Sequence, residues 1–217
     1  NITDTALIDI ENVQYINKKA DQSSIRILNS DIEESMIAAI EKAQKNGDTL
    51  GGQFRVLISG VPYGLGSYSS WNKKLNAKLS EAICSINAIK GVYFGADNAS
   101  HQLGSQLHDE IGFKKGQYTR SNNNAGGIEG GMSNSQTIII NGTMKPLSTL
   151  SKPLKSIDIK SKKGELAHKE RTDSCAVPAA AIVAESMVAL VIADTLLDKF
   201  GGDSLSSLNH HLQSAKY

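Results

Sequence analysis

The sequence predicts an α+β fold in which helices pack against largely antiparallel sheets. Two observations carry this prediction: apolar runs with helical spacing and short β-branched runs both occur, and they do not alternate regularly along the chain. The 217 residues, of which 40% are hydrophobic, are enough to bury a core. One domain spanning residues 1–217 is the simplest organisation.

The elements of the first half follow from local patterns. Ser30 and Glu33 stand at capping-box spacing before apolar residues of helical periodicity, and Gly47 stands where a left-handed C-cap falls. Alternating apolar residues that stop at Pro62 predict a strand that enters a tight loop. The predicted order is a strand at 25–28, a helix from 30 that ends before 47, a strand at 53–61, a helix at 71–90 and a strand at 92–94.

The second half begins with a segment rich in Lys, Asn and Gly, residues 114–131, which predicts a long mobile loop. Strands are predicted at 137–141 and 156–160. The last helix opens at Pro178 and stops before Gly201. It is apolar enough to be tested as a membrane span, but it contains Glu185 and Asp194. Because a carboxylate at mid-bilayer costs roughly 2.5–3.5 kcal/mol, we expect a buried helix and no membrane partner.

Composition gives limits rather than a function. The 23 Lys and Arg residues against 22 Asp and Glu leave a net charge of +1, so we expect no nucleic-acid partner. Cys84 and Cys175 lie far apart without metal-type spacing, which argues against a disulfide scaffold and against a metal site, and fits a cytoplasmic protein. The chain starts at Asn1 with neither Met nor signal-peptide features, so we expect that it begins at a cut.

Two glycine pairs, Gly126-Gly127 and Gly130-Gly131, form the first candidate site. Successive glycine amides can cradle an anion, but this spacing matches neither a Walker loop nor a dinucleotide fingerprint. A flexible turn-rich loop is the alternative that the residues alone favour.

Two further segments carry charged groups next to predicted elements. In 145–149, an ammonium group and two hydroxyls flank a rigid proline, which suits either a phosphate site or a solvated strand end. In 171–175, Arg171 and Asp173 point to one side if the segment is extended, so that one can bind an anion while the other accepts a proton. An exposed ion pair is the alternative.

At these same positions the sequence resembles the chorismate synthases. The matching segments run in family order over nearly the whole chain: Gly47-Asp48-Thr49-Leu50-Gly51-Gly52, Gly60 to Tyr68, Ser85 to Gly91, Gly104-Ser105-Gln106, His108 to Ile111, Asn124 to Ile128 with Gly130-Gly131, Lys145-Pro146 and Arg171-Thr172-Asp173. The early Ser-His-Gly and Ser-Ala-Arg motifs of the family do not occur in this sequence.

The resemblance implies part of the chorismate synthase β-α-β sandwich, in which antiparallel sheets enclose helices, and a homotetramer for full-length members. The implied reaction converts 5-enolpyruvylshikimate 3-phosphate to chorismate and phosphate, an anti-1,4-elimination that requires reduced FMN. Because the family's catalytic histidines belong to the missing motifs, the alternative is an inactive FMN-binding or assembly fragment. Whether the flavin is reduced by NADPH on the enzyme or by an outside reductant stays open.

Residue roles also come from the resemblance. The implied flavin contacts are Asn87, Ala88, Gly130, Lys145, Pro146, Leu147, Ser148, Thr149 and Arg171. Leu147 replaces a residue that is often small and polar in the family, so its contact is expected through the backbone. Asp173 matches the carboxylate that helps to remove the flavin N5 proton. Arg171 would stabilise negative charge on flavin or substrate.

Overall fold

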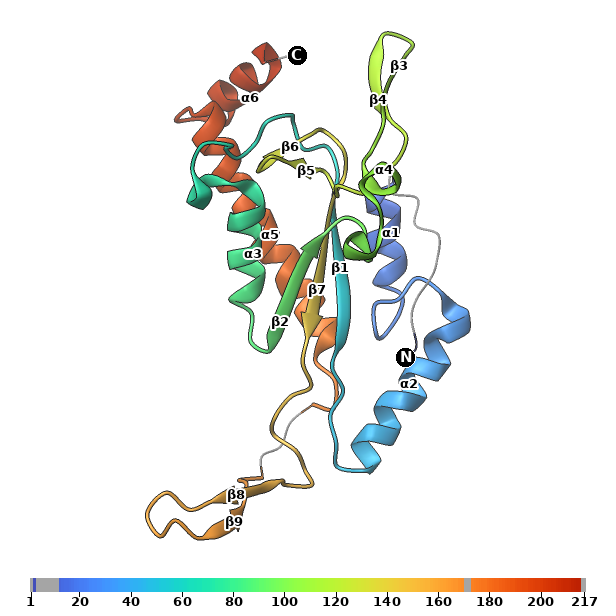
Figure 1. Cartoon of the computed structure of the whole chain (residues 1–217), viewed down its shortest axis with the longest axis vertical. Helices are drawn as coiled ribbons and strands as arrows, with labels where there is room; N and C mark the ends of the chain where they lie inside the picture. Colours follow the sequence, from blue (N-terminus) through green and yellow to red (C-terminus); the bar gives the residue numbers. More distant parts are fainter. Residues whose placement is uncertain (1, 3–11, 170–172, 216–217) are drawn as a thin grey trace.

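The computed structural model describes residue 2 and residues 12–169 and 173–215. Its centre is a three-stranded antiparallel sheet in the order β1-β7-β2 (Figure 1). These strands are β1 Gly52–Ile58, β7 Ile138–Met144 and β2 Ile89–Phe94. The middle strand therefore comes from a point in the chain about 80 residues after β1, a pairing that apolar spacing cannot reveal.

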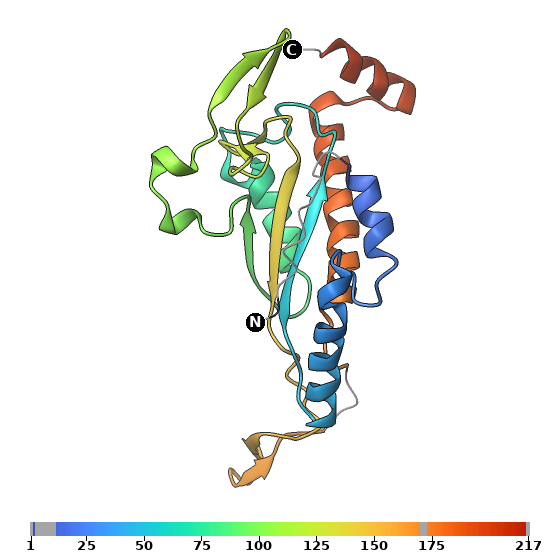
Figure 2. The same cartoon turned by 90° about the vertical axis from the view of Figure 1, so that its right-hand side faces the viewer.

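One face of this sheet is apolar and carries two helices, α3 Leu75–Cys84 and α5 Val177–Phe200. The two helices contact each other, α3 lies against β2, and α5 lies along β1 (Figure 2). Their buried side chains and the inward-facing strand residues make the core: Phe54, Val56, Val61, Leu65, Leu75, Leu79, Ile83, Ile89, Ile138, Ile140, Met144, Ala180, Ala184 and Val188. The α+β prediction is confirmed.

The other face of the sheet carries a polar row next to the apolar pair Leu57 and Ile139. Arg55, Asn141 and Tyr93 stand in one row because the register places Asn141 opposite both of the others. The Arg55 guanidinium donates to Asn141 Oδ1 over 2.7 Å and pairs with Asp97 at 2.9 Å. Burial and the negative charge and hydrogen bond of Asp97 raise the pKa of Tyr93 above its ordinary value.

The helices before the sheet are α1 Val13–Ala20 and α2 Ser30–Lys45. The strand predicted at 25–28 is wrong, because Ile25 lies in a turn and residues 26–28 are irregular. The Ser23 hydroxyl accepts from the backbone N–H of Ile25, and Arg26 has a positive φ of 58°. Arg26 also pairs with Glu185 of α5 at 3.9 Å.

The predicted helix at 71–90 is shorter than expected. A single turn η1 Trp71–Lys73 precedes α3, and the chain is extended at Lys74 between them. The connection to the next hairpin contains η2 Ala99–His101 and α4 Gly104–Leu107.

The segment 114–131 contains more regular structure than the predicted loop. It holds most of the hairpin β3 Ile111–Lys114 and β4 Gln117–Arg120, and it enters the hairpin β5 Ile128–Glu129 and β6 Met132–Ser133. In the stretch between the two hairpins, the backbone N–H groups of Asn124 and Ala125 donate to the Asp109 carboxylate over 2.8 and 3.0 Å. The sequence pattern missed these contacts because they join residues 15 or more positions apart; the mobility of the segment stays a prediction.

The remaining elements lie at the two ends of the molecule. The hairpin β8 Lys155–Ile157 with β9 Gly164–Leu166 projects at the lower end, and β3–β4 projects at the upper end (Figures 1 and 2). A final helix, α6 Leu205–Ser214, follows α5. It begins at Ser204, whose hydroxyl accepts from the backbone N–H of Ser207.

Helix α5 begins at Val177, one residue before the predicted start at Pro178, and it is buried on one face only. It is long and apolar enough to cross a membrane, and 22% of its most apolar 18-residue stretch is buried inside the protein. Ile182 and Leu190 are exposed, which corrects the prediction of a buried helix. Its carboxylates instead face protein cations, since Asp194 pairs with Lys78 at 3.0 Å.

Candidate functional site

Four segments meet where the central sheet ends toward β8–β9. We call residues 49–51, 87–88, 145–149 and 173–175 the basal cluster. Three hydrogen bonds join them: Lys145 N–H donates to the Ala88 carbonyl over 2.9 Å, the Thr49 hydroxyl to the Leu147 carbonyl over 2.6 Å, and Leu50 N–H to the Ser174 carbonyl over 2.7 Å. The segment 49–51 therefore links residues 145–149 to the segment that precedes α5.

Gly51 makes this close approach possible. A Cβ atom at Gly51 would lie 2.4 Å from the Met144 carbonyl oxygen and 2.8 Å from the nitrogen of Pro146. Both atoms belong to backbone, which cannot rotate away as a flexible side chain could. Close packing of backbone at the basal cluster thus explains why a glycine stands at position 51, in a segment that matches the family.

The basal cluster holds its backbone firmly while its polar side chains remain accessible. Lys145 and Asp173 are exposed, and so are Asn87, Pro146 and Ser148. Leu147 and Thr149 are half-buried. An ammonium group, two hydroxyls and a carboxylate in one region can bind an anion and accept a proton.

Ala88 has a left-handed φ of 68°, which is uncommon for a residue with a Cβ atom. This conformation turns the chain into β2 and presents the Ala88 carbonyl to Lys145. Arg171, the other predicted catalytic residue, lies outside the described residues.

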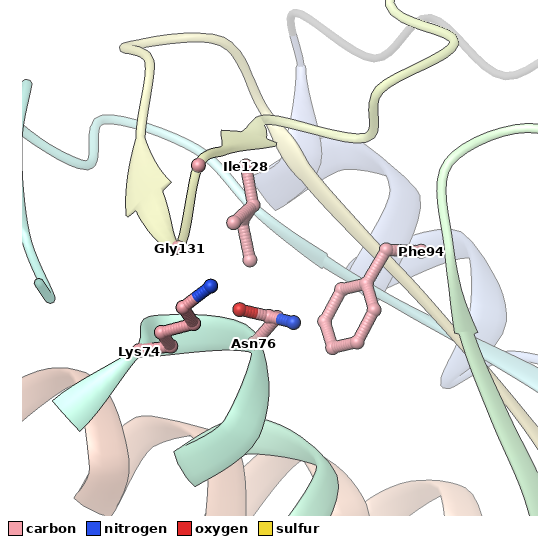
Figure 3. A pocket seen from close by; sticks show the side chains of 6 residues that line it. Lys74, Asn76, Phe94, Ile128 and Gly131 are labelled. Atoms are coloured by element: carbon pink, nitrogen blue, oxygen red, sulfur yellow. The ribbon is translucent and has the colours of Figure 1, made fainter. Parts of the chain in front are cut away.

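A second candidate site lies at the opposite end of the sheet. We call the cavity of about 290 Å³ lined by Lys74, Asn76, Phe94, Ile128, Gly130 and Gly131 the Gly130 pocket. Its side chains come from the start of α3, the end of β2 and the β5–β6 turn, and they converge on one space (Figure 3). Leu75 N–H donates to the Gly131 carbonyl over 2.8 Å and fixes the turn against the helix.

Asn76, which lines this pocket, has one polar atom that is buried without a partner. Asn76 Oδ1 is shielded from solvent and makes no hydrogen bond within the described part of the chain. An unsatisfied buried acceptor costs about 1–3 kcal/mol, so such atoms are rare unless a ligand or water completes them. The sequence analysis missed Lys74 and Asn76 because they stand in an amphipathic helical pattern that gives no sign of a cavity.

The structure thus divides the predicted flavin contacts. Asn87, Ala88 and residues 145–149 lie in the basal cluster with Asp173, whereas Gly130 lies in the other site. The six residues of β2 separate the two sites, which at about 3.3 Å per residue is roughly 20 Å.

In the described ranges, no group of three or more His, Cys, Asp or Glu side chains is placed to hold a metal ion.

Comparison with known proteins defines the class. An antiparallel sheet covered on one face by helices, with loop residues gathered at its ends, is an α+β architecture, and residues 3–197 match the chorismate synthase family. The chain belongs to the chorismate synthase family.

Relatives named chorismate synthase support this assignment. The one from Alkaliphilus metalliredigens is 50% identical over 201 residues, covering 92% of this chain and 53% of the relative. That from Listeria welshimeri is 49% identical over 203 residues, covering 93% and 52%. A crystal structure of chorismate synthase matches with a TM-score of 0.79 and 35% identity, over 95% of this chain and 55% of that one. The chain spans about half the length of the curated relatives it matches.

Proposed function

We propose that this chain acts in a chorismate synthase, a lyase that converts 5-enolpyruvylshikimate 3-phosphate to chorismate and inorganic phosphate with reduced FMN. Family membership supports the reaction class. The observation that carries the proposal is the basal cluster, which gathers from four distant segments the residues expected to bind flavin and to move a proton.

The donors of the basal cluster fit an anionic flavin cofactor. The Lys145 ammonium and the hydroxyls of Ser148 and Thr149 can bind phosphate or carbonyl oxygens. Asn87, Pro146 and Leu147 would add amide or backbone contacts. Reduced FMN, when bound, supplies electron density that helps the bond between carbon and phosphate oxygen to break.

Asp173 is the proposed proton acceptor. It is exposed beside Ser174, whose carbonyl is held by Leu50, so its carboxylate stands at the edge of the basal cluster. In the elimination a ring proton and the phosphate leave the substrate, and a carboxylate here can take up a proton. For Arg171 the proposed contact with negative charge rests on the family likeness alone.

Assembly and location belong to the same proposal. The exposed apolar side of α5 supports a protein whose helices are covered in a larger assembly, such as the expected homotetramer in the cytoplasm. The alternative function is that this chain alone serves FMN binding or assembly without turnover.

The test is anaerobic turnover of 5-enolpyruvylshikimate 3-phosphate with reduced FMN by this chain. We expect Asp173→Ala to lower kcat by roughly 10²–10⁴-fold, the usual contribution of a general base. Asp203→Ala, which changes another exposed aspartate after α5, should leave kcat unchanged. Equal activity of all three proteins would reject the role of Asp173.

Binding separates the two candidate functions. If the chain shows no turnover but binds FMN, and Lys145→Met weakens binding while Lys155→Met does not, the binding and assembly function is supported. If FMN fails to bind at all, the proposed cofactor site is rejected for this chain.

A further inference from the structure

Lys199, in the last turn of α5, holds a loop from a distant part of the chain. We call residues 62–67, which lie between β1 and η1, the Pro62 loop. The Lys199 ammonium group donates to the carbonyl oxygens of Tyr63 over 3.1 Å and of Gly64 over 2.9 Å. Gly64 also fits closely around the ammonium group, since a Cβ atom there would lie 2.6 Å from Nζ. The end of α5 therefore fixes the Pro62 loop.

The Pro62 loop in turn holds strand β6 through Ser133, which is 1% exposed. The Ser133 hydroxyl donates to the Pro62 carbonyl over 2.6 Å and accepts from Leu65 N–H over 2.9 Å. The Ser133 carbonyl accepts from Gly64 N–H over 2.8 Å, and Ser133 N–H donates to the Leu65 carbonyl over 3.0 Å. Four hydrogen bonds thus join the loop to the strand that follows the β5–β6 turn.

The loop also touches the β5–β6 turn directly. A Cβ atom at Gly66 would lie 2.5 Å from the Gly131 carbonyl oxygen, and one at Gly131 would lie 2.7 Å from the Ser67 carbonyl oxygen. Both contacts join backbone to backbone, and packed backbone transmits a displacement because it has no free space to absorb it. A shift of the Pro62 loop should therefore shift the turn that carries Gly130.

Helix α5 connects this turn to the other candidate site. It follows the basal-cluster segment 173–175, in which the Ser174 carbonyl accepts from Leu50 N–H. Its 24 residues span about 36 Å at 1.5 Å per residue, so one rigid helix runs between the two ends of the sheet (Figure 1).

We propose that Lys199 is a positioning residue, which acts through the Pro62 loop to hold the β5–β6 turn in place for the cofactor. The flavin contact of Gly130 comes from the family likeness, so this role rests on the proposed function. The alternative is that Lys199 only stabilises its own helix. A cation in the last turn interacts favourably with the helix dipole, and Nζ lies 5.6 Å from the centre of the Phe200 ring.

Hydrogen exchange of backbone amides separates positioning from helix stabilisation. We expect Lys199→Met to speed exchange of the Ser133 amide at least about fivefold, because the loop that accepts this N–H is released. The Lys145 amide, which is bonded in the basal cluster, should exchange as before. Lys199→Arg keeps a cationic donor and should restore slow exchange. Lys19→Met changes an exposed lysine in the last turn of α1 and should have no effect on Ser133.

A pair of glycine substitutions displaces the ammonium group without changing Lys199. Gly64→Ala puts a Cβ atom against Nζ, so the ammonium group must move. Gly60→Ala imposes similar backbone strain, with a φ of 73° against 77° at Gly64, but meets nothing within 4 Å. We expect Gly64→Ala to speed exchange at Ser133 as Lys199→Met does, and Gly60→Ala to leave it unchanged.

Titration with FMN, under conditions in which every variant is folded, shows whether the cofactor depends on this link. We expect Lys199→Met to weaken FMN binding by roughly three- to tenfold, and Lys199→Arg to restore it. Unchanged exchange at Ser133 in Lys199→Met, or unchanged FMN affinity, would overturn the positioning role. Lys145→Met should weaken FMN binding without changing exchange at Ser133, so the two sites are tested separately. If the wild type does not bind FMN, the proposed function fails and the positioning role for a cofactor fails with it.

Discussion

The two ends of the central sheet use the same kinds of residue for different purposes. In the basal cluster, hydrogen bonds to backbone carbonyls join four segments, and polar side chains such as those of Lys145, Ser148 and Asp173 are exposed to solvent. In the Gly130 pocket, side chains line an open cavity, and Asn76 among them has a buried, unpaired acceptor. The comparison shows that a rigid backbone frame and an open pocket of converging side chains are separate ways to prepare a binding site.

The largest expected effect comes from glycine substitutions at the two ends. Gly51→Ala forces a Cβ atom against two backbone segments and should lower the free energy of unfolding by about 3 kcal/mol. Gly130→Ala meets open space and should cost only about 1–2 kcal/mol, from its left-handed φ of 59°. Urea denaturation measures both, with Gly164→Ala as the control because it also meets nothing within 4 Å. An equal loss of unfolding free energy in Gly51→Ala and Gly130→Ala would show that the basal cluster is no more tightly packed than the Gly130 pocket.

A second substitution tests the frame itself. Thr49 is buried, and Thr49→Val removes the hydroxyl that donates to the Leu147 carbonyl, so we expect a loss of about 1–3 kcal/mol. Residues 145–149 should also move, so we expect FMN to bind more weakly when its affinity is measured by titration. Thr195→Val is the matched control: its hydroxyl donates to Val191 of its own helix, so its loss should be smaller and FMN binding should not change. Unchanged stability in Thr49→Val would contradict a hydrogen-bonded frame.

The smallest effect concerns the polar row of the sheet that connects the two ends, and it is seen only at alkaline pH. The folded state raises the pKa of Tyr93 above its ordinary value of 10.0, mainly through burial and then through Asp97. A raised pKa means that the folded state holds the proton more tightly. The stabilisation is therefore complete below pH 10.0 and is lost as the pH rises through the raised pKa.

Denaturation measured across this pH range should show a loss of stability in the wild type that Tyr93→Phe reduces. Tyr118→Phe, which changes an exposed tyrosine of β4, should leave the loss as it is. The same alkaline loss in wild type and Tyr93→Phe would show that Tyr93 is not held in this row.

Local chemistry allowed part of the fold to be predicted. Helix α2, strand β1 and the first turn of α5 follow from helical periodicity, alternation and the fixed φ of Pro178. The cap of α2 is Asn29, which accepts from the backbone N–H of Asp31, and not the predicted Ser30. The turn at 25–28 was missed because the Ser23 hydroxyl competes for backbone N–H groups that a strand would need. The β3–β4 hairpin was hidden by polar residues, although Phe113 and Tyr118 pack edge to face across it at 5.2 Å.

The sequence by itself determined the family, the α+β class and the identity of the polar residues in the basal cluster, because these depend on residue types in a fixed order. Only the tertiary structure decided their distribution in space: β7 pairs with β1 and β2 across long stretches of chain, which carries Lys145 to Ala88 and leaves Gly130 at the other end. Burial was decided in the same way. Asn76 becomes an unpaired acceptor, and α5 stays half exposed, because solvent access depends on neighbours that are distant in sequence.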